Sequence, residues 1–137
     1  MKTAWSAFFA AVVMTLTLRP SPSSPADQEI VIRAATIEPE VFQTVTGQRV
    51  NFTKRTDLPV HVEFGWDPRQ HQVYQLPASG PIWVIFNRPG THPYTVHVYG
   101  PGPMTALHGV VEVAEDPQRP WGVGTCTAVV MGNCLEP

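Results

Sequence analysis

The sequence has little of what most enzymes and nucleic-acid-binding proteins require. Nine Lys and Arg residues face eleven Asp and Glu residues, so there is no basic excess to attract nucleic acid or an anionic membrane surface. Beyond residue 26 the single serine is Ser79, in a turn-like Ala-Ser-Gly segment, so no Ser-His-Asp arrangement can be built. No glycine loop of the phosphate-binding kind occurs. We therefore expect that the protein is not an enzyme and that it acts by binding a ligand or a partner protein.

Helix signals are also scarce beyond residue 26. Prolines recur from Pro39 to Pro120, and no stretch between them keeps an apolar period of three to four residues. Short runs rich in Val, Ile, Phe, Tyr and Thr, bounded by Gly, Pro, Asp and Asn, predict strands instead. We expect strands at 30–35, 41–45, 49–53, 60–64, 72–75, 82–86, 94–99 and 109–113. This spacing predicts an all-β protein, a Greek-key β-sandwich of seven or eight strands.

The N-terminal 26 residues have the pattern of a secretory signal peptide. A positive start at Lys2 precedes an uncharged apolar run over 4–18 and a Pro- and Ser-rich stretch ending at Ala26. The run is shorter than the roughly 20 apolar residues of a membrane span, although an uncleaved anchor is the alternative. We expect three parts: a signal peptide (1–26), the sandwich (27–116) and a C-terminal extension (117–137). Export to the periplasm or secretion follows.

The two cysteines, Cys126 and Cys134, lie close together near the C-terminus. In an oxidising compartment this spacing favours a disulfide that pins a C-terminal hairpin. Metal ligation by the two thiols is the alternative.

All five histidines fall between residues 61 and 108. Imidazole is the commonest metal ligand in proteins, and copper sites take two or three. His61 and His97 each lie in a predicted strand, opposite a valine face, and His108 precedes the last strand. We expect these three to meet at one end of the domain as a metal site; the alternative for each is solvation, or a bond to a neighbour such as Glu63. His71 and His92 occupy turn-like contexts and are expected to be surface residues.

Several segments, in this order, resemble the cupredoxins, the small blue-copper β-sandwiches. IEP at 37–39 and VTGQRVNF at 45–52 resemble the opening hairpin of that family. His61 matches its first copper ligand, PGT at 89–91 resembles the approach to its ligand loop, and LHGVVEV at 107–113 resembles its closing strand. The resemblance covers about 80 residues and implies a cupredoxin-like fold with copper as cofactor.

The sequence departs from that family at the ligand loop. Val96 or His97 stands where the family has its Cys ligand, and Leu107 stands at the axial Met, with Met104 three residues earlier. Because the blue site needs a copper–thiolate bond, this chain is not expected to be a blue electron carrier.

Two interpretations follow from the resemblance. In the first, the exported domain binds copper through His61, His97 and His108 and works with a copper-handling or other periplasmic protein. In the second, the sandwich is metal-free and serves as an interaction or accessory module, with Trp66, Tyr74 and Tyr99 as aromatic anchors.

Overall fold

The computed structural model describes residues 28–65, 72–118 and 126–135, and in these ranges the chain is all-β. The predicted signal peptide, His71 and Trp66 lie outside the described residues. In the described part of the chain, no helix is long and apolar enough to cross a membrane. The strands of the described residues are β1 (Glu29–Ile32), β2 (Ile37–Glu38), β3 (Val41–Val45), β4 (Arg49–Lys54), β5 (Val60–Phe64), β6 (Gln72–Gln75), β7 (Ile82–Phe86), β8 (Gly90–Val98), β9 (Thr105–Ala114), β10 (Ala128–Val130) and β11 (Asn133–Leu135).

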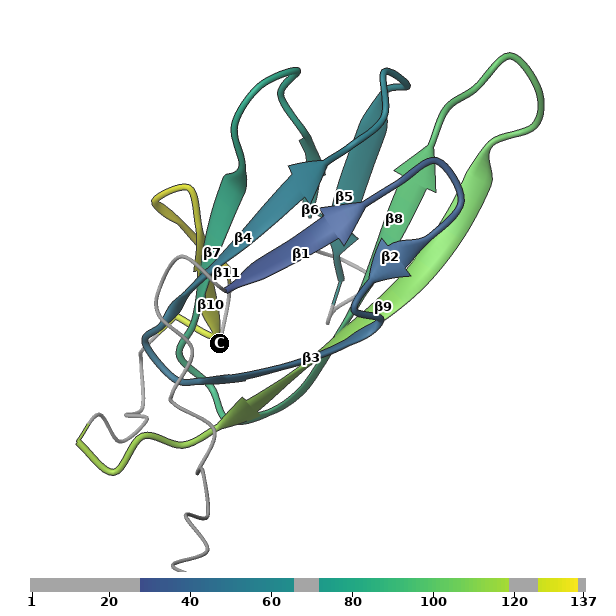
Figure 1. Cartoon of the computed structure of the whole chain (residues 1–137). Coiled ribbons are helices and arrows are strands. Elements are labelled where there is room, and N and C mark those ends of the chain that lie inside the picture. The colour runs from purple at the N-terminus through teal and green to yellow at the C-terminus, as the bar shows by residue number, and fades with distance from the viewer. Residues whose placement is uncertain (1–27, 66–71, 119–125, 136–137) are drawn as a thin grey trace, which may run out of the picture.

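The strands form two sheets that pack face to face as a β-sandwich (Figure 1). The first sheet has the order β11-β10-β7-β4-β1-β2, and the second has the order β3-β9-β8-β5-β6. Each sheet is mixed, because β1 pairs in parallel with β4 and β3 pairs in parallel with β9, while the other pairs are antiparallel. The long β8–β9 hairpin projects at one end of the molecule (Figure 1).

The core lies between the sheets and is built by the two-residue alternation of the strands. In β5 the valines Val60 and Val62 are fully buried, while His61 between them is on the outer face. The Phe52 ring stands edge-on to the rings of Phe64 and Tyr94, at centroid distances of 5.5 and 5.2 Å. This aromatic cluster joins the two sheets at the centre of the sandwich.

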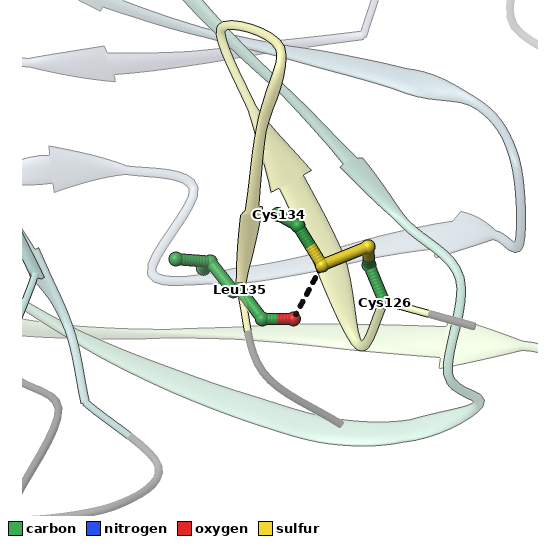
Figure 2. The surroundings of a disulfide bond; sticks show 3 residues. All are labelled: Cys126, Cys134 and Leu135. Atoms are coloured by element: carbon green, nitrogen blue, oxygen red, sulfur yellow. Dashed lines mark hydrogen bonds between the residues drawn. A yellow bond between two sulfur atoms is a disulfide. The ribbon is translucent and has the colours of Figure 1, made fainter. Parts of the chain in front are cut away.

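A disulfide joins Cys126 to Cys134 across the β10–β11 hairpin (Figure 2). The Cys134 sulfur lies 3.6 Å from the carbonyl oxygen of Leu135. Through β10 the hairpin pairs with β7, so it extends the six-stranded sheet. The predicted disulfide is confirmed, and the hairpin that it closes is part of the sandwich's first sheet.

The predicted β-sandwich is confirmed, while its Greek-key and cupredoxin-like details remain predictions. The described residues hold eleven strands where seven or eight were expected. Three of the additional ones are very short: the two-residue β2 and the two strands of the disulfide hairpin. Strands this short carry too few alternating residues to be recognised in a sequence.

Candidate functional site

The three predicted ligands all lie on the outer, solvent-facing side of the five-stranded sheet. His61 belongs to β5, His97 to β8 and His108 to β9, which are neighbouring strands in the order β9-β8-β5. Each alternates with buried or part-buried residues that face inward, as the valines around His61 and His97 do. Strand alternation therefore brings to one face three histidines that are 36 and 11 residues apart along the chain.

His61 and His97 are direct partners across the antiparallel β5–β8 pair. Side chains in such a pair have Cβ atoms about 5 Å apart, which lets two imidazoles reach one ion. The His61 ring also lies against the ring of Tyr99, at a centroid distance of 4.9 Å. These two histidines form the centre of the candidate site.

His97 has a polar partner on each ring nitrogen. Its Nε2 lies 3.1 Å from Oε2 of Glu63, and its Nδ1 lies 3.0 Å from the thioether sulfur of Met104. The side chains of His97 and Glu63 are about one-fifth exposed, at 21% and 23%. The imidazole is thus held between a carboxylate and a soft sulfur donor at the edge of solvent.

Met104 and Tyr99 come from the two ends of the connection that joins β8 to β9. This connection reads Tyr-Gly-Pro-Gly-Pro-Met over 99–104, and its two prolines each fix the backbone dihedral φ. Tyr99 continues the pairing of β8 with β5, since its N–H donates to the carbonyl of Pro59. The connection therefore places an aromatic ring and a thioether beside the two histidines.

His108 lies apart from this pair. Its partner across β8 is Thr95, whose Oγ1 is 3.4 Å from His108 Nδ1. Together with Glu63, these two residues line a hollow of about 440 Å³ on the same face. His108 lies on the strand next to that of His97. Along that strand it is two residues, or one row of same-face side chains, from the position opposite His97.

The predicted convergence of three imidazoles is not found in the described residues. No three His, Cys, Asp or Glu side chains there are grouped closely enough to hold a metal ion. Strand spacing gives the reason: His61 and His108 are two strands and two residues apart, or roughly 12 Å between Cα atoms. The sheet thus groups His61 with His97 and separates His108 from them.

His92 is buried, so its expected place on the surface is wrong. Its side chain is 3% exposed and packs against Phe86, at a centroid distance of 5.1 Å. Its Nε2 lies 2.6 Å from the carbonyl oxygen of Arg88, so this nitrogen carries the proton and donates it. Burial lowers the pKa of His92, which keeps the ring neutral. The sequence around Pro93 resembles a turn, which is why the strand was expected to begin only at residue 94. In the structure β8 begins at Gly90, and its alternation turns His92 inward.

The donors around His97 suit copper better than they suit a hard cation. Imidazole nitrogens and a thioether bind copper ions, whereas magnesium and calcium prefer oxygen. A thiolate is excluded, because the two cysteines of the chain are joined to each other on the six-stranded sheet. The residues present therefore fit copper without fitting a blue site. In the sequence, Met104 lies three residues before Leu107, which stands at the axial position of the cupredoxin resemblance.

A larger hollow, of about 700 Å³, lies elsewhere on the sandwich. Amide and hydroxyl side chains line it, among them Gln28, Thr44 and Gln48, and Glu112 is the one acidic residue that the described part of the chain contributes. It contains no histidine and no sulfur atom among the described residues, so it is not part of the candidate metal site.

Comparison with protein-family models and with curated proteins found no match to this sequence.

Proposed function

We propose that this chain is an exported β-sandwich that binds copper on the outer face of its five-stranded sheet and does not act as a blue electron carrier or as an enzyme. The observation that carries the proposal is the direct cross-strand pairing of His61 with His97. Two imidazoles about 5 Å apart at their Cβ atoms offer two copper ligands on rigid strands. His108 is the third predicted ligand and lies on the next strand of the same face.

Export is supported by the apolar leader at residues 4–18 and by the Cys126–Cys134 disulfide. Disulfides persist in oxidising compartments such as the periplasm and the extracellular space. In that setting a copper-binding module would store the ion or deliver it to a copper-handling protein. The part-exposed position of the two histidines on the outer face of the sheet suits transfer to a partner, because a partner protein can dock on that face.

Calorimetric titration of the mature domain with Cu(II), followed by its visible spectrum, tests the proposal. We expect dissociation constants of micromolar or below, with no intense band of copper–thiolate character. The double variant His61→Ala, His97→Ala is expected to abolish this binding. The variant Gln43→Ala is the matched control, since Gln43 lies on the same sheet face but on β3, where it bonds Glu112.

Binding that is absent, or that survives loss of both histidines, would refute the proposal. The remaining candidate would then be a metal-free interaction module that uses Tyr99, which is 41% exposed beside His61. The single variant His108→Ala adds a separate measurement. We expect it to weaken binding less than either His61→Ala or His97→Ala, because of its distance from that pair.

A further inference from the structure

We propose that Met104 is a copper ligand and that, with His61 and His97, it forms a site selective for the cuprous ion. This inference rests on the proposed function, and it names the oxidation state of the ion that the site takes. Its starting point is the 3.0 Å separation between Met104 Sδ and His97 Nδ1.

The partners of His97 make this separation informative. Glu63 Oε2 lies 3.1 Å from Nε2 and Met104 Sδ lies 3.0 Å from Nδ1, so a carboxylate is placed at one ring nitrogen and a thioether at the other. A metal-ligating histidine commonly donates the N–H of one ring nitrogen to a carboxylate and binds the ion through the other nitrogen. In this arrangement Nδ1 is the ligating nitrogen, and it is the one that lies beside the Met104 sulfur.

The distances allow an ion to enter with little movement. Metal bonds to nitrogen and sulfur are about 2.0 and 2.3 Å, so a trigonal ion would hold the two atoms roughly 3.7 Å apart. Met104 is 46% exposed and its side chain has three rotatable bonds. A shift of the sulfur by less than about 1 Å into solvent therefore opens the site, while the two histidines stay fixed on paired strands.

The third donor follows from the sheet register. His61 is the cross-strand partner of His97 and lies on the same face, so its ring can turn from Tyr99 toward the same point. The resulting set of two imidazoles and one thioether has no anionic ligand. Soft thioether sulfur favours Cu(I), whereas an all-nitrogen set favours Cu(II). The alternative is a set of three imidazole nitrogens with His108 as the third ligand. Because His108 is separated from His61 and His97, it does not complete that set.

The test is a comparison of Cu(I) and Cu(II) affinities in the folded mature domain. Cu(I) affinity is measured without oxygen by competition with a chromogenic cuprous chelator, using ascorbate as reductant. The variant is Met104→Leu and its matched control is Met131→Leu. Met131 is also 46% exposed but lies on the six-stranded sheet, in the turn between β10 and β11.

We expect Met104→Leu to weaken Cu(I) binding at least tenfold and to change Cu(II) binding by less than threefold, while Met131→Leu changes neither. X-ray absorption should show a sulfur neighbour at about 2.3 Å in the Cu(I) form of the wild type and of Met131→Leu, and none in Met104→Leu. Unchanged Cu(I) affinity in Met104→Leu, with binding still lost in the double histidine variant, would overturn the inference and leave the proposed function standing. Failure of the wild-type domain to bind either ion would overturn both.

Discussion

The ring of Tyr94 occupies the space that a side chain at Gly109 would fill. The two residues are partners across the β8–β9 pair, and a Cβ atom added at Gly109 would lie 2.2 Å from the Tyr94 ring. Gly109 is therefore required by a close approach of side chain to backbone. This contact lies on the inner face of the strands that carry His97 and His108 on their outer face, so it supports the sheet beneath the candidate site.

Gly109→Ala is expected to destabilise the fold. The added methyl group overpacks the core, which commonly costs about 1–3 kcal/mol in the free energy of unfolding. Gly102→Ala is the matched control, because no atom lies within 4 Å of a Cβ at that position. Urea denaturation should show a lower midpoint for Gly109→Ala only. Equal midpoints for the two variants would show that the Tyr94 ring moves aside without cost.

Tyr94→Phe is expected to stabilise the fold. The Tyr94 hydroxyl is buried, and no hydrogen-bond partner for it lies among the described residues. A buried unpaired hydroxyl costs about 1–3 kcal/mol, and a phenylalanine of the same shape avoids that cost. Thermal unfolding at neutral pH should therefore give a higher midpoint for the variant. A lower midpoint would contradict this and would show that the hydroxyl is favourably hydrogen-bonded in the folded protein.

The same variant should resist alkali better. Burial, with a smaller effect from the Glu40 carboxylate, raises the pKa of Tyr94 well above its ordinary value of 10. Above pH 10 the unfolded chain releases this proton and the folded chain retains it, so the wild type loses stability as pH rises. The unfolding midpoint of Tyr94→Phe should fall less between pH 9 and pH 11. Parallel curves for the two proteins would contradict this.

The disulfide is expected to stabilise the sandwich without affecting copper. Cys126 and Cys134 are separated by 8 residues, and closing so small a loop contributes about 2–3 kcal/mol in the chain-entropy model. The double variant Cys126→Ala, Cys134→Ala should lose about that much free energy of unfolding. Its copper affinity should stay at the wild-type value, because β10 and β11 belong to the other sheet. Loss of copper binding in a variant that remains folded would place the sulfur atoms in the site.

The sequence predicted those features that depend on local pattern. Alternation in 60–64 and 94–99 placed His61 and His97 opposite the buried valines, as the structure has them. Local alternation does not predict the register between strands, because register depends on which strands pair and at which residue. The pairing of His61 with His97, and the displacement of His108 by one row, could not be read from either strand alone.

Met104 was the residue that sequence reasoning undervalued. By the ligand spacing of the cupredoxins, which the sequence resembles, Met104 falls three residues before the axial position. The connection over 99–104 is short and leads directly from β8 into its neighbour β9. It therefore brings the Met104 sulfur to His97 on the same face of the sheet. The sequence did contain a signal for this, since a short Gly- and Pro-rich link between two strands predicts a hairpin. In such a hairpin, residues just outside the two strand ends lie close together.

Glu63 is expected to act on copper through His97 as a positioning residue. Its carboxylate lies against Nε2, and Nδ1 is the ring nitrogen beside Met104, so a carboxylate that accepts the Nε2 hydrogen leaves Nδ1 to bind the ion. Loss of such a partner typically weakens metal binding about 10- to 100-fold, and we expect this of Glu63→Ala for Cu(I). Glu63→Gln should recover most of the affinity, because its amide oxygen can accept the same hydrogen.

Glu112→Ala serves as the control for that series. Glu112 carries the same charge on the same sheet face, but it lies on β9 beside β3, where it accepts a hydrogen bond from Gln43. An electrostatic effect of the face as a whole would lower Cu(I) affinity similarly in Glu63→Ala, Glu63→Gln and Glu112→Ala. Orientation of His97 would lower it in Glu63→Ala alone. Cuprous chelator competition on the three variants separates these two causes, since Gln removes the charge of Glu63 and keeps its acceptor.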